Sequence, residues 1–134
     1  MTNYFEVSEF HKPQFVLTKE IETKIQHHID ILNPIREKLG IPIRISKRSG
    51  YRPKIYELSR GRSGNSQHTF KGKGAVDLTC KLDQLQLLFE LLQESEYTRI
   101  CLYVNKNFIH ADMKEINGSQ QVFICTDLHW ELYT

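Results

Sequence analysis

The feature that most constrains the fold is a run of helical periodicity that comes before any strand-like sequence. From residue 18 onward, apolar side chains recur three or four positions apart, which places them on one face of a helix. These side chains are Ile21, Ile25, Ile29 and Leu32. Thr18 can cap the helix, and Glu20 and Glu22 suit the positive end of its dipole. The core must therefore form around an early amphipathic helix.

The end of this helix allows two interpretations. Asn33 followed by Pro34 is typical of a cap and a first helical position, so a second short helix can run over residues 35–39 and end at Gly40. Equally, one kinked helix can continue through the proline. Beyond it, isoleucines alternate with polar residues over 41–46, which predicts a strand, and Pro42 favours an edge position or a strand start.

The rest of the chain changes from loop to helix and then to strands. Residues 47–74 are basic and rich in Gly and Ser, which indicates a functional loop with one short helix at 53–59. Residues 74–79 read as a strand and 82–92 as a second amphipathic helix. Residues 100–104, 108–113 and 121–125, separated by turn sequences, predict an antiparallel meander.

This order of elements predicts an α+β fold in which N-terminal helices pack on an antiparallel sheet. The length of 134 residues suits a single domain spanning residues 1–134. Three cysteines, Cys80, Cys101 and Cys125, match neither a disulfide framework nor a thiolate metal knuckle, so we expect reduced core residues.

Charge and hydropathy limit the partners and the location. A net charge of +2 does not imply a nucleic-acid or membrane partner, although basic residues gather within 47–73. The first ten residues lack the basic patch and apolar run of an export signal, and no apolar stretch is long enough to span a bilayer. We therefore expect synthesis in the cytoplasm, and the sequence is silent on oligomeric state.

Three residues have the chemistry of a hydrolytic metal site. His68 lies in the loop before the strand that carries Asp77, and His110 lies in a later strand. Hydrolytic zinc takes three imidazole or carboxylate ligands and keeps a fourth position open, where the pKa of a bound water falls to about 7. The sequence predicts one zinc per chain on these residues. Three other histidines, His11, His27 and His28, are interpreted as surface residues. His129 can have either a packing role or a role in the site.

These segments resemble the zinc D-alanyl-D-alanine carboxypeptidases and murein endopeptidases of the peptidase M15 type, whose fold is shared with the hedgehog signalling domain. The family carries S-x-H, then G-x-A-x-D, and later F-[IV]-H-[VA]-[DS]. Ser66-Gln67-His68, Ala75-Val76-Asp77 and Phe108-Ile109-His110 match these patterns. Upstream, Ser49-Gly50-Tyr51-Arg52 matches the S-G-Y-R element of the murein-endopeptidase branch. The resemblance covers residues 25–124 in the family order.

Two departures from the family pattern concern the site. The gap between His68 and Asp77 is two residues longer than usual, so the loop at 70–73 must bulge. Many members carry an acidic general base three residues before the second histidine, where this chain has Asn107. Asp112 shares a strand face with His110, so it can serve as the base or as a partner that orients the ligand.

The resemblance implies a peptidase acting on stem or cross-bridge peptides of peptidoglycan, as a DD-carboxypeptidase or murein endopeptidase. It implies that Arg52 binds a peptide carboxylate or the developing oxyanion. It also implies that Tyr51, Ser66 and Gln67 lie near the substrate. A phage-type lysin released by a holin, or a virion component, would reach the wall without an export signal. The alternative is a catalytically weak zinc protein that binds wall peptides. A basic nucleic-acid-binding domain is a third interpretation.

Overall fold

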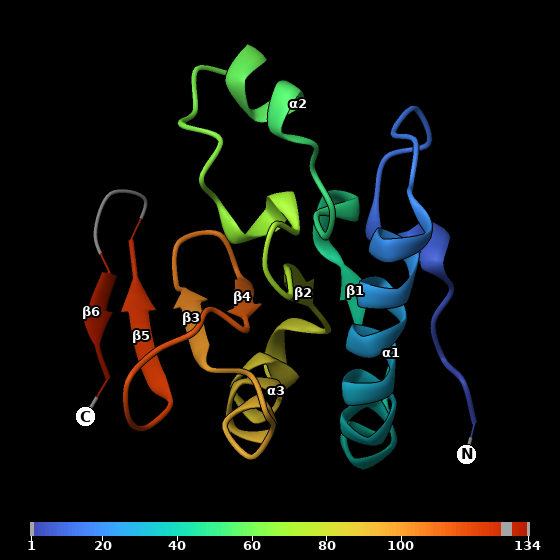
Figure 1. Cartoon of the computed structure of the whole chain (residues 1–134). Helices are drawn as coiled ribbons and strands as arrows, with labels where there is room; N and C mark the ends of the chain where they lie inside the picture. The colour runs from blue at the N-terminus through green and yellow to red at the C-terminus, as the bar shows by residue number, and fades with distance from the viewer. Residues whose placement is uncertain (1, 127–129, 134) are drawn as a thin grey trace.

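The computed structural model describes residues 2–126 and 130–133 (Figure 1). The helices are α1 (Lys19–Leu39), α2 (Lys54–Ser59) and α3 (Leu85–Leu92). Single 3-10 turns are formed by Val7–Phe10, Ser46–Arg48, Gln67–Thr69 and Leu82–Gln84. The strands are β1 (Arg44–Ile45), β2 (Ala75–Thr79), β3 (Arg99–Tyr103), β4 (Phe108–Asp112), β5 (Gln121–Cys125) and β6 (Trp130–Leu132). The predicted α+β class is confirmed.

Helix α1 runs without interruption through Pro34, which selects the continuous helix from the two interpretations of the sequence. At its start, the Thr18 hydroxyl accepts a hydrogen bond from the Ile21 N–H at 3.2 Å. At its end, Gly40 adopts a left-handed conformation with φ 79° and closes the last turn onto Arg36. The proline costs one backbone hydrogen bond. The buried face of α1 includes Ile25, Ile29 and Leu32 and holds the helix in place.

The six-stranded sheet has the order β1-β2-β4-β3-β5-β6 (Figure 1). The hairpin of β3 and β4 is antiparallel and turns at residues 104–107, as predicted. Strand β5 is parallel to β3, so the expected antiparallel meander does not continue past β4. Strand β4 already has β2 and β3 as its two neighbours, and β5 pairs with the free edge of β3. It enters beside the start of β3, where the Gln121 N–H donates to the Thr98 carbonyl.

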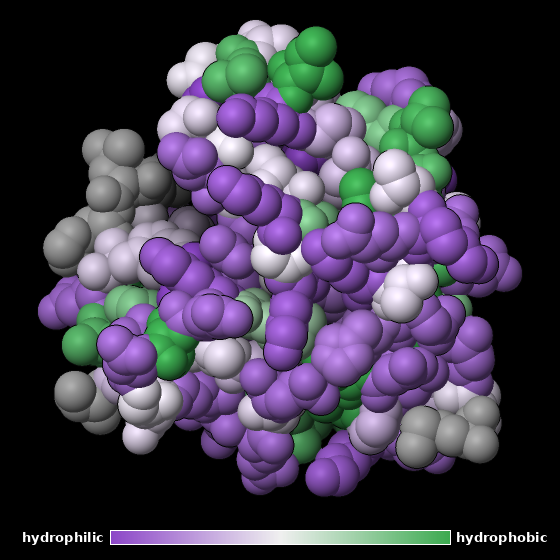
Figure 2. Space-filling view, in the orientation of Figure 1, coloured by the Kyte–Doolittle hydropathy of each residue, from purple (hydrophilic) through white to green (hydrophobic). Residues whose placement is uncertain are grey.

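The core lies where α1 and α3 meet each other and α3 meets strands β3 and β4. Its fully buried side chains come from all three layers of this contact. They include Ile25, Leu32, Leu88, Phe89, Leu92, Leu78, Ile100 and Ile109. The outer face shown in Figure 2 is mainly hydrophilic, and hydrophobic side chains gather on it over α2. No helix in the described ranges is long and apolar enough to cross a membrane.

The cysteines differ from the expectation of three reduced residues. Cys101 on β3 and Cys125 on β5 are paired as a disulfide, with Cα atoms 6.1 Å apart. The pairing follows from the parallel contact of β3 and β5, which the sequence pattern did not predict. Cys80 is free and buried, as expected.

His28 was interpreted as a surface residue, and the structure shows that this was wrong. Its ring is fully buried between α1 and the loop that follows His68. The Tyr97 hydroxyl donates to Nδ1 at 2.8 Å, and Nε2–H donates to the Lys73 carbonyl at 3.0 Å. Burial lowers the pKa of His28 to about 4. His27, in contrast, is exposed as expected and pairs with Glu96.

A pH dependence of stability follows from His28. Its pKa is lower in the folded protein than the ordinary 6.5, so its contribution is complete above pH 6.5 and is lost as the pH falls towards 4. Between about pH 7.5 and about pH 4, the free energy of unfolding of the metal-free protein should fall by roughly 3 kcal/mol more than that of His28→Gln. Chemical denaturation at both pH values measures this difference. Equal decreases in the two proteins would contradict it.

Candidate metal centre

The three predicted ligands come from separate elements and meet at one point. His68 lies in the turn Gln67–Thr69, while Asp77 on β2 faces His110 on β4 as a cross-strand pair. His68 Nε2 lies 3.3 Å from Asp77 Oδ1 and 3.3 Å from His110 Nδ1. His110 Nδ1 lies 3.1 Å from Asp77 Oδ1. The structure therefore brings the predicted set together as a triangle of three donor atoms.

The dimensions of this triangle suit a tetrahedral metal ion. With metal–ligand bonds of about 2.0–2.1 Å, as zinc makes, ligand atoms of a tetrahedron lie about 3.3 Å apart. The three side chains are almost completely buried, so their donor atoms are held away from bulk water. Two imidazoles and one carboxylate also form a donor set that leaves a fourth position for water or substrate. The residues present thus fit a hydrolytic zinc ion.

Hydrogen bonds fix which nitrogen of each histidine faces the ligand point. His68 Nδ1–H donates to the Gly50 carbonyl at 2.8 Å, which leaves Nε2 for the metal. His110 Nε2–H donates to Asp112 Oδ2 at 2.7 Å, which leaves Nδ1 for the metal. Partners of this kind orient ligand rings and increase their basicity. The two histidines therefore offer opposite ring nitrogens.

The segment Ser49-Gly50 braces two of the three ligands. The Ser49 hydroxyl donates to Asp77 Oδ2 at 2.8 Å, and the Asp77 N–H donates to the Ser49 carbonyl at 2.9 Å. Gly50 passes so close to Phe10 that an added Cβ would lie 2.6 Å from the Phe10 carbonyl oxygen. These two residues were identified in the sequence only as part of the S-G-Y-R element. Their contacts show that the element shapes the ligand triangle.

Asp112 lies on the far side of the His110 ring from the ligand point. Its carboxylate is fully buried and accepts hydrogen bonds from the Arg99 guanidinium at 2.6–3.1 Å and from the Lys114 N–H at 3.0 Å. The sequence left it open whether Asp112 acts as general base or orients a ligand. The geometry favours orientation of His110, because the ring separates the carboxylate from the ligand triangle.

The charges of the metal-free site are strongly coupled. Burial lowers the pKa of His110, but hydrogen bonds and charge interactions with Asp112 and Asp77 outweigh burial and raise that pKa to about 9. Burial raises the pKa of Asp77, but His68 and His110 outweigh it and hold that pKa well below its usual range. At neutral pH His110 is thus a cation between two carboxylates. A metal must displace its Nδ1 proton.

A cleft of about 610 Å³ opens at the ligand Asp77. Three aromatic residues, Phe15, Tyr56 and Phe108, line part of it. Its cationic residues are Lys12, Lys47, Arg48, Arg52, Arg62 and Lys106. Among the described residues that line the cleft, Asp77 is the only acidic one. The structure thus places Arg52, the predicted substrate arginine, in an electropositive cleft beside the ligand triangle.

The remaining predicted site residues lie nearby but differ in their contacts. Tyr51 is buried, and its ring packs edge-on against Phe15 and Phe70. Its predicted contact with the substrate stays a prediction. Ser66 accepts a hydrogen bond from the His68 N–H at 3.1 Å and caps the turn that presents this ligand. Gln67 lies half-buried in the same turn, and its substrate role stays a prediction.

The longer loop between His68 and Asp77 contains a close contact between Phe70 and Gly74. Phe70 and Gly74 both have positive φ values, of 57° and 96°. The Phe70 ring fills the space that a Cβ on Gly74 would occupy, at 2.6 Å. Phe70 therefore belongs to the core. The two extra residues bulge without moving the ligands apart.

Trp130 and Arg99 also support the site, and no role was predicted for either residue. The Trp130 ring centroid lies 5.6 Å from that of His110, and its Nε1–H donates to the Tyr103 hydroxyl at 2.8 Å. The Arg99 guanidinium lies 5.2 Å from the Trp130 ring centroid. Arg99 could have been found from the hairpin turn, because the register places it opposite Asp112. His129, for which a site role was left open, lies outside the described residues.

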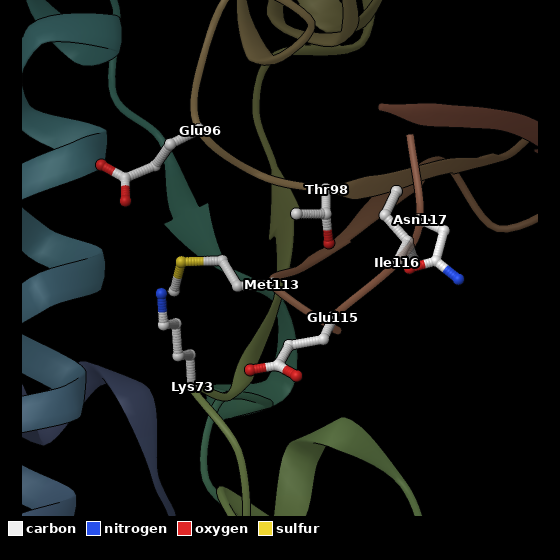
Figure 3. A pocket seen from close by; sticks show the side chains of 7 residues that line it. All are labelled: Lys73, Glu96, Thr98, Met113, Glu115, Ile116 and Asn117. Atoms are coloured by element: carbon white, nitrogen blue, oxygen red, sulfur yellow. The ribbon is translucent and has the colours of Figure 1, made fainter. Parts of the chain in front are cut away.

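A second hollow, of about 530 Å³, lies away from the predicted ligands. Figure 3 shows that Lys73, Glu96 and Glu115 approach it from different segments. Its lining shares no residue with the ligand triangle or with the cationic cleft. Its mixed charges and its lack of histidine make it a weaker candidate for the site of chemistry.

The contacts of Asp112 generate a prediction about metal affinity. Asp112→Asn removes the charge that orients His110, so zinc affinity should fall by about 10–100-fold. Asp83→Asn, at an exposed carboxylate paired with Lys81, is the matched control and should bind zinc like the unmodified protein. Competition with a chromogenic chelator measures both. Unchanged zinc affinity together with lost turnover would instead make Asp112 a base.

Comparison with known proteins agrees with the geometry. A family model described as Peptidase M15 matches residues 3–112, which include the three ligands, Asp112 and the cationic Arg52 and Arg62. No curated protein and no solved structure matched the chain. The model matches well over half of the chain and contains the whole ligand triangle. The chain therefore belongs to the peptidase M15 family.

Proposed function

We propose that this chain is a zinc-dependent peptidase that cleaves peptide bonds in peptidoglycan. The observation that carries the proposal is the buried triangle of His68, Asp77 and His110 beside a cationic cleft. Zinc held by these residues supplies a Lewis acid and a bound water with a pKa of about 7. Membership of a peptidase family supports hydrolysis as the reaction.

The chain's own residues have distinct parts in the proposed reaction. The Ser49 hydroxyl and the Gly50 carbonyl hold Asp77 and His68 in their ligand geometry. Asp112, itself fixed by Arg99, keeps the proton on His110 Nε2 and directs Nδ1 to the metal. Arg52 lies in the cleft, where a guanidinium can bind a peptide carboxylate or the oxyanion that develops at the scissile bond.

The charge of the cleft supports the proposed substrate class. Stem and cross-bridge peptides of peptidoglycan carry carboxylates, which the cationic lining would attract. We propose DD-carboxypeptidase or murein-endopeptidase activity on such peptides, in the setting of a phage-type lysin or virion component.

A second function is favoured by one observation: Asn107 occupies the position where many family members carry an acidic general base. Asn107 is exposed in the turn between β3 and β4, and the carboxylate of Asp112 is engaged behind His110. Of the described residues that line the cleft, only the ligand Asp77 is acidic. An amide cannot take a proton from water. A zinc protein that binds wall peptides and cleaves them slowly is therefore the alternative.

Incubation with purified sacculi separates the two functions. The zinc-loaded protein should release peptide fragments that mass spectrometry can identify, and removal of zinc by a chelator should stop the release. His68→Ala should abolish the release of fragments, because two remaining protein ligands are too few to hold a hydrolytic zinc ion. His27→Ala, at an exposed histidine on α1, is the control and should keep full activity. Binding to sacculi without released fragments would support the alternative and contradict cleavage.

A further inference from the structure

Glu57 is a fully buried carboxylate in the short helix α2 that the reaction described above does not use. Its Oε2 accepts a hydrogen bond from Arg62 Nε at 2.8 Å and forms an ion pair with Arg62 Nη2 at 2.6 Å. Its Oε1 lies 3.5 Å from Arg52 Nε. A carboxylate is buried at a large energetic cost unless cations surround it. Here one carboxylate is shared by two guanidinium groups, so the group of three keeps a net positive charge.

Both arginines face the cleft that opens at the metal ligand Asp77. The exposed fraction is 23% for the Arg52 side chain and 47% for that of Arg62. Arg62 is held by one hydrogen bond and one close ion pair to the same carboxylate oxygen of Glu57. In the described structure, Arg52 Nε and Glu57 Oε1 are buried without a hydrogen-bond partner. Arg52 can therefore turn towards an anion without breaking a formed hydrogen bond.

The remaining charges of the cleft select the ligand. Lys12, Lys47 and Arg48 add positive charge to its lining, and a metal would neutralise Asp77. A single guanidinium group can bind a planar carboxylate through two parallel hydrogen bonds, and a second one nearby adds positive charge. We propose that Glu57 is a positioning residue that holds Arg62 beside Arg52 as a subsite for a free carboxylate of the peptide substrate. The subsite itself follows from the contacts, while the peptide nature of the ligand rests on the proposed function.

Metal-free protein tests the subsite without any cleavage. The probes are acetyl-D-alanyl-D-alanine and the same peptide with a C-terminal amide, which differ in one carboxylate. In a low-chloride buffer, amide-resonance titration by NMR gives the affinity for each. We expect the acid to bind at least about tenfold more tightly than the amide, with shifts at Arg52 and Arg62. Equal affinities, or no acid binding at about 20 mM, would overturn the proposal.

Variants at Arg62 test whether this residue causes the tighter binding of the acid peptide over the amide. Arg62→Gln should reduce the ratio of acid to amide affinity to about one, and Arg62→Lys should reduce it in part because lysine lacks the planar fork. Arg60→Gln removes the same charge from an exposed arginine on the same segment that does not line the cleft, and should keep the ratio. A ratio that survives Arg62→Gln, or that falls equally in Arg60→Gln, would overturn the proposal.

Glu57→Gln separates positioning from general support of the fold. A structural defect weakens the binding of acid and amide alike, whereas loss of positioning weakens only the acid. We expect the ratio to fall while zinc affinity stays unchanged. A folded Glu57→Gln protein with the unmodified ratio would overturn the role of Glu57. Should this variant unfold, the two Arg62 variants still decide whether the subsite exists.

Inorganic phosphate distinguishes a carboxylate subsite from a phosphate site. If phosphate displaces the acid peptide and binds about tenfold more tightly than that peptide, carboxylate recognition would be contradicted and a phosphorylated ligand favoured. Because every peptide titration uses metal-free protein, inactivity on sacculi would leave a positive binding result intact. Conversely, cleavage of sacculi without acid-amide discrimination would refute only the subsite.

Discussion

The antiparallel pairing of β2 with β4 is the constraint on which the rest of the site depends. It sets Asp77 directly opposite His110, so two ligands are placed by backbone hydrogen bonds before any metal arrives. The third ligand, His68, comes from a loop and needs more restraint. The Gly50 carbonyl holds its ring, and the Arg52 N–H donates to the His68 carbonyl. A preformed triangle limits the reorganisation that metal binding requires.

Buried carboxylates organise the surroundings of the site in a common way. Asp112 is held by Arg99 and orients His110, whereas Glu57 is held by Arg62 and borders Arg52. In each case an acidic group withdrawn from solvent contacts a nitrogen-bearing side chain of the ligand triangle or of the cleft. Each carboxylate lies against a guanidinium group, which offsets the cost of burying its charge. The site is therefore supported by ion pairs on both sides of the ligand triangle.

Local periodicity and motif order predicted the parts of the fold that depend on neighbouring residues, including α1, the β3–β4 hairpin and the ligand triad. The sequence could not predict the parallel placement of β5, which depends on the edges left free in the sheet. The Cys101–Cys125 disulfide follows from that placement. Burial of Tyr51 depends on its packing against Phe15 and Phe70. The pairing of Glu57 with two arginines depends on how the irregular segments on either side of α2 turn back towards it. No periodic pattern reports such contacts.

The most direct test of the account is a crystal structure of the zinc-soaked protein, with the ion located by its anomalous scattering. The account predicts one zinc bound by His68 Nε2, Asp77 Oδ1 and His110 Nδ1, with bonds of about 2.0–2.2 Å. It also predicts that the hydrogen bond from His110 Nε2–H to Asp112 persists. Zinc bound elsewhere, or at His110 Nε2 in place of Nδ1, would contradict it.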